Sequence, residues 1–167
     1  RGVARTFQIV RIFKSMTVLE NVMVGAMLRH RAVPEARRRA AQALDFTGLS
    51  ARAGEPAGRL TVAEQKRLEL TRALATEPKL LLLDEVMAGL TAAEVHQAVE
   101  LVRSIQARGI ACVVVEHVME GIMPIADRML VLENGRKIAE GTPAEYSDQL
   151  DLIFRSLGGK RPVALIE

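Results

Sequence analysis

Short apolar runs and amphipathic stretches alternate along the second half of this chain, and they predict strands and helices in turn. Three runs have the length and composition of buried strands: Lys79–Asp84, Ala111–Glu116 and Met129–Glu133. Between the first two, apolar residues recur at the spacing of one helical face: Val95, Val99, Val102 and Ile105. Gly109 then marks the end of that helix. The pattern predicts strand–helix–strand units, which favour parallel strands.

Helix starts are marked by a repeated Thr-x-x-Glu pattern. In this capping box a hydroxyl and a carboxylate reciprocally bond the first free N–H groups of a helix. The pattern occurs at Thr17–Glu20, Thr61–Glu64, Thr91–Glu94 and Thr142–Glu145. The last box adds Pro143 at the first helical position, where a missing N–H is harmless. We expect a helix to begin at each box.

A hairpin is predicted near the C-terminal end of the sheet. Asn134-Gly135 separates Met129–Glu133 from Arg136–Glu140, and Asn-Gly between two such runs is a strong hairpin signal. The predicted order of the second half is strand–helix–strand–helix–strand–hairpin strand–helix. We therefore expect an α/β fold with a parallel sheet and an antiparallel edge. The tail after Gly158-Gly159 is expected to be short and frayed.

The first half has a different organisation. Residues from about 17 to 74 have an almost wholly helical pattern, with breaks near Pro34, Gly48 and Gly54–Gly58. This predicts a helical subdomain that precedes most of the sheet.

Composition and charge narrow the classes of function. The chain has 167 residues, 49% of them hydrophobic, which suits one domain with a real core and argues against disorder. No run of about 18 apolar residues predicts a membrane-spanning helix. The single Cys112 is interpreted as a passive core thiol. The net charge is +3, and arginines gather at Arg29, Arg31 and Arg37–Arg39. Aromatic residues make up only 3%, so we interpret these arginines as a solvated helix face and expect no nucleic-acid partner.

The candidate chemistry lies at the end of the first predicted strand. Leu80–Leu83 is followed directly by Asp84 and Glu85, which places two carboxylates at the carboxyl edge of the sheet. Buried carboxylates are costly unless a metal or hydrogen bonds compensate them. This arrangement suits hydrolysis of a nucleotide bound to Mg²⁺. The Gly-x-x-x-x-Gly-Lys-Ser/Thr phosphate loop of such enzymes does not occur in these 167 residues.

Five segments, in this order, resemble the motifs of ATP-binding cassette (ABC) transporter ATPases. They are Thr6-Phe7-Gln8 for the Q-loop, Leu60–Arg67 for the signature, Leu80–Glu85 for Walker B, Ala88–Thr91 for the D-loop and His117 for the switch histidine. Three stretches are similar to the LivG-like ATPases of bacterial branched-chain amino acid importers: Arg5–Gln8, Met16–Val22 and Asp84–Leu90.

The resemblance implies roles for the residues at the strand ends. Glu85 would polarise the attacking water, Asp84 would hold Mg²⁺ through water, and His117 would contact the γ-phosphate of ATP. Gln8 would complete the metal site and sense the membrane partner. The alternative for Glu85 is a strand-end carboxylate that caps a turn, and His30 and His96 are expected at the surface.

The resemblance also implies nucleotide contacts made in trans, across a dimer of ATPase subunits. These contacts come from the signature positions Thr61, Val62, Ala63 and Glu64. The resemblance further implies that Gly89 and Leu90 of the D-loop contact nucleotide. Val62 and Ala63 stand where the family has glycines, and Glu64 stands where it has glutamine. Thr91 replaces the usual terminal aspartate of the D-loop. The alternative for residues 61–64 is an ordinary capped helix.

For the whole protein, the resemblance implies a P-loop NTPase-like cassette with a signature-bearing helical subdomain at about 15–75 and a RecA-like sheet lobe at about 76–167. The implied function is ATP hydrolysis that energises an importer of branched-chain or related amino acids, with ATP and Mg²⁺ as cofactors. The implied partners are membrane permease subunits, a second ATPase subunit and, indirectly, a periplasmic solute-binding protein. The implied location is peripheral, on the cytoplasmic face of the inner membrane.

Two other functions stay open from the sequence. One is a soluble ABC protein of DNA repair or translation, against which the lack of coiled-coil heptads counts. The other is a non-catalytic remnant that scaffolds a partner. Because the chain begins at Arg1, shortly before Gln8, we expect Arg1 to be a cut point in a longer cassette and these residues alone to bind ATP weakly or not at all.

Overall fold

The computed structural model describes residues 2–133, 135–146 and 162–166, so Asn134 of the predicted hairpin turn lies outside the described residues. The chain divides into two compact units, Arg1–Leu81 and Leu82–Glu167. The division falls within strand β2 (Leu80–Asp84). No helix of the described residues is long and apolar enough to cross a bilayer.

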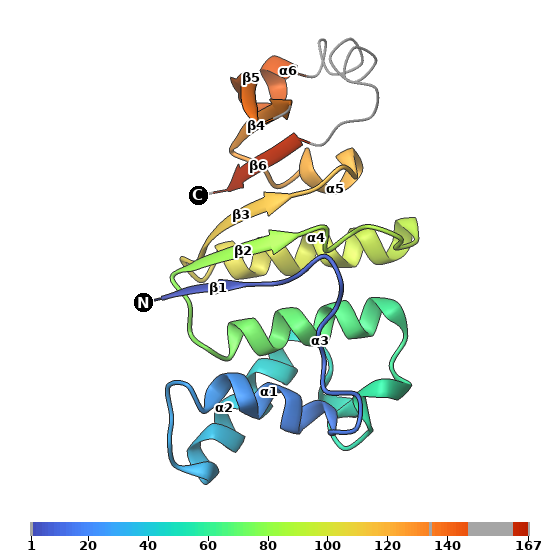
Figure 1. The fold of residues 1–167 in the computed structure, drawn as a ribbon, viewed down its shortest axis with the longest axis vertical. Helices are drawn as coiled ribbons and strands as arrows, with labels where there is room; N and C mark the ends of the chain where they lie inside the picture. The colour runs from blue at the N-terminus through green and yellow to red at the C-terminus, as the bar shows by residue number, and fades with distance from the viewer. Residues whose placement is uncertain (1, 134, 147–161, 167) are drawn as a thin grey trace. The chain divides into compact units, whose positions relative to one another are not determined.

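The first unit is mainly helical (Figure 1). Its elements are β1 (Val3–Arg5), α1 (Val18–Ala26), α2 (Val33–Thr47), the 3₁₀ turns η1 (Ser50–Arg52) and η2 (Ala57–Arg59), and α3 (Val62–Leu74). The carbonyl of Gly2 accepts hydrogen bonds from the N–H groups of Lys79 (2.7 Å) and Leu80 (3.0 Å), which places the start of β1 beside the start of β2. Two of the predicted breaks lie at the ends of α2: Pro34 is the second residue of the helix, and Gly48 follows its last residue in the left-handed conformation.

Three helices build the core of this unit. Their inward residues include Val18, Val22, Leu44 and Leu68, which are almost completely buried. Gly25 allows α1 to approach α3 closely, because a Cβ atom there would overlap the carbonyl oxygen of Arg72. Only glycine fits this crossing without movement of the backbone.

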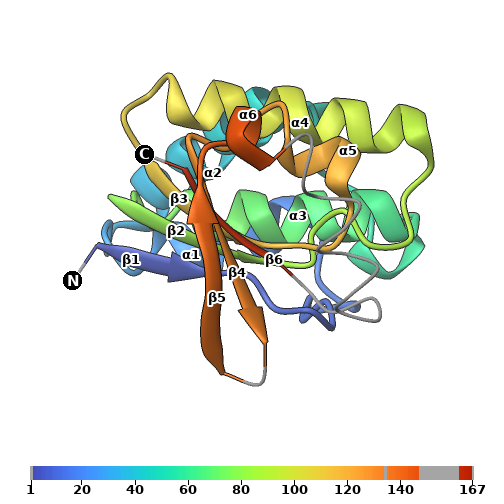
Figure 2. The ribbon, with the colours of Figure 1, turned by 90° about the horizontal axis from the view of Figure 1, so that it is seen from above.

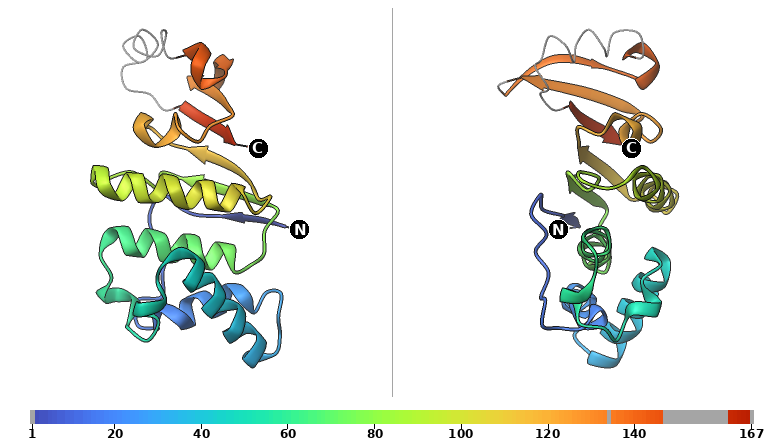
Figure 3. Two further views of the ribbon diagram at one scale, coloured as in Figure 1. Left: turned by 180° about the vertical axis from the view of Figure 1, so that it is seen from behind. Right: turned by 90° about the vertical axis from the view of Figure 1, so that its right-hand side faces the viewer.

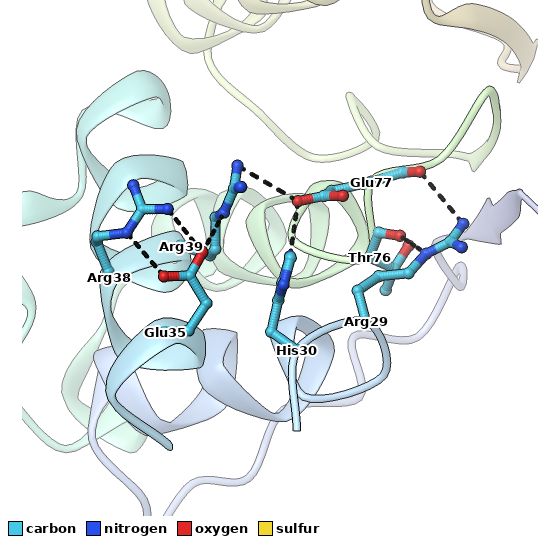
Figure 4. A network of polar contacts seen from close by, with 7 residues as sticks. All are labelled: Arg29, His30, Glu35, Arg38, Arg39, Thr76 and Glu77. Atoms are coloured by element: carbon cyan, nitrogen blue, oxygen red, sulfur yellow. Dashed lines mark hydrogen bonds and ion pairs between the residues drawn. The ribbon is translucent and has the colours of Figure 1, made fainter. Parts of the chain in front are cut away.

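The arginine-rich turn between α1 and α2 is tied to the segment after α3, as Figure 4 shows. Arg29 donates to the carbonyl of Thr76 (2.9 Å), and the His30 ring contacts the Glu77 carboxylate (2.9 Å). Arg38 and Arg39 both pair with Glu35, at 2.6 and 2.9 Å. These arginines therefore have local structural partners, in agreement with the surface interpretation made from the sequence.

The second unit is a sheet with helices. After the end of β2 come α4 (Ala92–Gln106), β3 (Ala111–Val115), α5 (Met119–Ile122), β4 (Arg128–Glu133), β5 (Arg136–Gly141), α6 (Pro143–Tyr146) and β6 (Pro162–Ile166). Figure 3 shows α4 lying along one side of β3. The predicted stripe on α4 is buried: Val95, Val99, Val102 and Ile105 are at most 5% exposed. Antiparallel pairing of β4 with β5 confirms the predicted hairpin.

The position of β6 corrects one expectation. The tail after Gly159 was expected to be frayed, yet residues 162–166 form a strand that pairs antiparallel with both β3 and β4 (Figure 2). The strand order in this unit is β2-β3-β6-β4-β5, so an antiparallel strand lies inside the sheet as well as at its edge. Without β6, the N–H and C=O groups along one edge of β3 and one edge of β4 would have no strand partner. Pairing with both edges explains why residues 162–166 form a strand there.

All four predicted capping boxes are present. The Thr17, Thr61 and Thr91 hydroxyls each accept from the backbone N–H three residues later, and that residue's carboxylate accepts from the threonine N–H. Thr142 and Glu145 make the same pair of bonds ahead of α6. The pattern correctly located the starts of α1, α3, α4 and α6, because the two partners of each box are close in sequence.

Candidate functional site

The end of β2 holds the two candidate carboxylates. Burial alternates along this strand: Leu81 and Leu83 are buried, while Asp84 is partly exposed. Glu85 follows with only 5% of its surface exposed and a φ of 50°. A non-glycine residue in this left-handed region is strained, and such strain is concentrated at functional sites. The N–H of Glu85 donates to the carbonyl of Val115 (2.9 Å), which anchors the strained residue to β3.

A tight turn connects Glu85 to α4. The N–H of Ala88 donates to the carbonyl of Glu85 (3.4 Å), and that of Leu90 donates to the carbonyl of Met87 (3.2 Å). Gly89 has a φ of 73° and is exposed, so it supplies the left-handed residue that this turn needs. Both D-loop candidates, Gly89 and Leu90, thus lie within five residues of Glu85 and immediately before the capped start of α4.

His117 follows the end of β3, the strand beside β2. Its side chain is 45% exposed and therefore accessible to a ligand. The preceding Glu116 is completely buried and accepts from the His117 N–H (3.1 Å). Asp84, Glu85 and His117 therefore lie at the ends of neighbouring strands, as expected from the sequence.

The Gln8 segment belongs to the first unit. Gln8 is exposed, whereas Thr6 is buried. Glu69 on α3 is only 3% exposed, and its carboxylate accepts hydrogen bonds from the N–H groups of Phe7 (3.4 Å) and Arg11 (2.9 Å). Gln8 lies between these two bonded residues in the sequence. This fixes the segment to the same helix that begins at the signature.

Two further side chains hold the same segment. Asn21, buried on α1, accepts from the Phe13 N–H (2.8 Å) and donates to the Phe13 carbonyl (3.0 Å). Arg72 donates to the Arg11 carbonyl and lies over the Phe13 ring. Burial lowers the pKa of the Arg72 guanidinium, while the nearby Glu69 carboxylate acts in the opposite direction. None of these anchors was identified from the sequence, because their partners are distant along the chain.

The signature segment forms the N-terminus of α3. Val62 is 63% exposed, and the N–H groups of the first helical turn have no acceptor inside the helix. Glu64 turns back to accept from the Thr61 N–H (2.8 Å) and also pairs with Arg52 (2.7 Å). Its negative charge is thereby engaged by the cap and by an arginine. Ala63 lies between Val62 and Glu64 in the first turn of α3.

The candidate residues fall into two groups. Asp84, Glu85, Gly89, Leu90 and His117 belong to the second unit, and Gln8 with residues 61–64 belongs to the first. Among the described residues, no group of three or more His, Cys, Asp or Glu side chains is arranged to hold a metal ion. Mg²⁺ in nucleotide sites takes only one or two protein carboxylates, with phosphate and water oxygens as its other ligands. The partly exposed Asp84 carboxylate fits that requirement.

Comparison with known proteins finds one family model and several relatives that all belong to ABC transport systems. The family model described as "ABC transporter" matches residues 1–88. The chain is 37% identical to the high-affinity branched-chain amino acid transport ATP-binding protein LivG of Salmonella typhimurium, over 94% of this chain and 68% of that protein. It is 35% identical to the corresponding protein BraF of Pseudomonas aeruginosa, over 95% of this chain and 68% of that protein.

Solved structures have the same fold. A crystal structure of the ADP conformation of an ATP-binding cassette of an ABC transporter superimposes with a TM-score of 0.79 and 28% sequence identity. The alignment covers 94% of this chain and 68% of that one. This similarity confirms the fold class expected from the sequence.

Proposed function

Because the chain belongs to the ABC transporter family of ATPases, we propose that it energises an importer of branched-chain or related amino acids by hydrolysing ATP. One observation carries the hydrolytic part of this proposal: Glu85 is buried, left-handed and anchored to β3, directly after Asp84 at the carboxyl end of β2. The solute class rests on the names of LivG and BraF.

Three residues of the second unit have separate roles in the proposed hydrolysis. Glu85 orients and polarises the attacking water, which requires a carboxylate held in one position. Asp84 would hold a bound Mg²⁺ through water. His117, accessible at the end of β3, donates toward the γ-phosphate and helps to place the water. A bound Mg²⁺ supplies charge neutralisation on the phosphate oxygens.

The residues of the first unit contribute to nucleotide binding in a different way. Thr61, Val62, Ala63 and Glu64 present the positive N-terminus of α3 to the γ-phosphate of ATP held by a second ATPase subunit. Gly89 and Leu90, which belong to the second unit, contact nucleotide from the D-loop. Gln8 would complete the site of a bound Mg²⁺ and respond to the membrane partner. Pairing of Glu64 with Thr61 and Arg52 supports this arrangement, because it reduces repulsion between Glu64 and a phosphate.

The partners follow from the type of transporter. Permease subunits form the membrane pathway, and the helical subdomain around Met16–Leu49 faces them. A periplasmic solute-binding protein delivers the solute to them. The protein would then be peripheral on the cytoplasmic face of the inner membrane. Exposed apolar side chains of this subdomain, such as Leu28 (78%) and Val33 (54%), support a protein partner for it.

Uptake of radiolabelled leucine tests the proposal in cells whose only copy of the gene is the full-length wild type, Glu85→Gln or Glu100→Gln. Glu100 is an exposed residue of α4 that pairs with Arg103 at 2.7 Å, so it is a matched control for the substitution. We expect Glu85→Gln to abolish uptake and Glu100→Gln to retain it. ATP hydrolysis without uptake of leucine, isoleucine or valine would contradict the solute class, and equal uptake in all three strains would contradict the role of Glu85.

A further inference from the structure

We propose that Glu116 is a positioning residue, which fixes the backbone after Glu85 and the backbone of His117 relative to each other through one buried carboxylate. This inference rests on the proposed hydrolytic function and adds a residue to which the family resemblance gave no role.

The contacts of Glu116 join the two candidate catalytic residues. Its Oε1 accepts from the N–H of Met87, two residues after Glu85, at 2.5 Å. Its Oε2 accepts from the N–H of His117 at 3.1 Å and lies 3.9 Å from Nδ1 of the same histidine. One rigid group therefore bonds to both strand-end segments.

The surroundings of Met87 add a second constraint. The Met87 side chain is completely buried, and a Cβ atom at Gly121 would overlap its sulfur. The side chain is thus packed against α5 while the backbone N–H is held by Glu116. Because the N–H of Glu85 is also bonded to Val115, the turn from Glu85 to Met87 is held at both ends, by the last residue of β3 and by Glu116 directly after it.

The burial of Glu116 requires an explanation. Cys112, Val114 and Glu116 follow one inward-facing row of β3 and its end, and each is at most 1% exposed. An apolar residue would continue this row at no desolvation cost, whereas a buried carboxylate is costly unless hydrogen bonds compensate it. Two N–H donors from separate segments provide that compensation and specify one geometry.

The substitution Glu116→Gln removes one of the two hydrogen bonds while it keeps a side chain of nearly the same size and shape. The amide that replaces the carboxylate has one acceptor oxygen, so its NH₂ group would face either the Met87 or the His117 N–H. One buried donor is then left unpaired, and the turn or the histidine shifts. Misplacement of a catalytic group by about 1 Å can lower a rate about 10²-fold.

The test uses the full-length gene product with Glu116→Gln, Glu116→Asp and Val114→Ala. Val114 is two residues earlier on the same buried row, so Val114→Ala weakens the core without removing either hydrogen bond. The measurements are kcat for ATP hydrolysis, the Kd for ATP, the melting temperature and the hydrogen-exchange protection of the Met87 and His117 amides.

We expect Glu116→Gln to lower kcat at least about tenfold while the Kd for ATP changes less than about threefold. It should also lose protection at one of the two amides. Glu116→Asp, which keeps both acceptor oxygens, should recover part of kcat, and Val114→Ala should keep kcat and both protected amides despite a lower melting temperature.

Equal kcat values for wild type and Glu116→Gln would overturn the inference, as would equal losses of kcat in Glu116→Gln and Val114→Ala. Failure of the proposed function has a different signature: the wild type itself would not hydrolyse ATP. In that event, unchanged amide protection in Glu116→Gln would overturn the positioning role, and loss of protection would support it independently of activity.

Discussion

Several glutamate side chains fix backbone segments of this chain, because their carboxylates accept hydrogen bonds from backbone N–H groups. Glu20, Glu64 and Glu94 close the starts of α1, α3 and α4, while the buried Glu69 and Glu116 hold segments from elsewhere in the chain. A carboxylate has several acceptor sites, so one side chain can fasten two N–H groups at once. Glu69 binds the backbone of Phe7, the residue before the candidate Gln8, and Glu116 binds the backbone of the candidate His117.

The chemistry of Cys112 gives a prediction at this scale. The thiol is 1% exposed, and burial raises its pKa to about 11. At neutral pH the thiolate that reacts with thiol reagents is therefore scarce as well as inaccessible. We expect native protein to react slowly with DTNB at about pH 8 and denatured protein to react at once. Complete reaction of the folded protein within seconds would contradict the burial of this thiol.

The ion pairs of Glu35 predict a weak dependence of stability on pH. Hydrogen bonds from Arg38 and then Arg39 lower the pKa of Glu35 from 4.5 to about 2. The folded state therefore favours the ionised form, and the resulting stability is present above pH 4.5 and lost as the pH falls toward about 2. The effect is small because the pair is solvent-exposed and screened by salt.

Thermal melting of wild type and Glu35→Gln tests this sign. Wild type should melt at a slightly higher temperature near pH 6, and the difference should shrink as the pH approaches about 2. High salt should reduce the difference near pH 6. A difference that grows on acidification would contradict the assignment.

Prediction of residues from the sequence succeeded where the partners are close along the chain. The Thr-x-x-Glu spacing contains both members of a capping box, so each cap was visible in the sequence. Glu69 and Phe7 are 62 positions apart, and Glu116 and Met87 are 29 apart. No local pattern contains such a pair. A glutamate on the inward row of β3 was the one available signal for Glu116, and it indicates burial but not its partners.

At the scale of elements, periodicity located the helices and strands, and pairing decided where the strands lie. The stripe on α4 and the apolar runs of β2, β3 and β4 were all visible in the sequence. The interior place of β6 was not, because residues 162–166 gain their structure from β3 and β4, which are distant in sequence. The crossing of α1 and α3 was also not visible, although it depends on a single glycine.

That crossing gives a prediction with an internal control. Gly25→Ala would place a methyl group against the Arg72 carbonyl, so we expect a loss of stability of about 1–3 kcal/mol. Gly54→Ala is the matched control, because no atom lies within 4 Å of the added methyl group. Urea denaturation should show a lower midpoint for Gly25→Ala and little change for Gly54→Ala. Equal midpoints for Gly25→Ala and wild type would contradict the close contact.

At the scale of the whole molecule, the candidate chemistry is shared between two compact units. Asp84, Glu85 and His117 belong to the second, whereas Gln8 and the start of α3 belong to the first. The order of the five motifs predicted the family correctly, and the similarity to LivG over 94% of the chain confirms it. The individual roles stay predictions, because a motif specifies position in the chain but not the approach of a bound nucleotide.

ATP turnover by the full-length gene product, compared between wild type and Glu85→Gln, tests the central claim most directly. The substitution keeps the size of the side chain but removes the carboxylate that polarises water. We predict that hydrolysis falls at least about 10²-fold while ATP still binds and is recovered intact with the protein. Glu100→Gln should hydrolyse ATP at the wild-type rate. Equal turnover by wild type and Glu85→Gln would contradict the assignment of Glu85 as the catalytic residue of this ATPase.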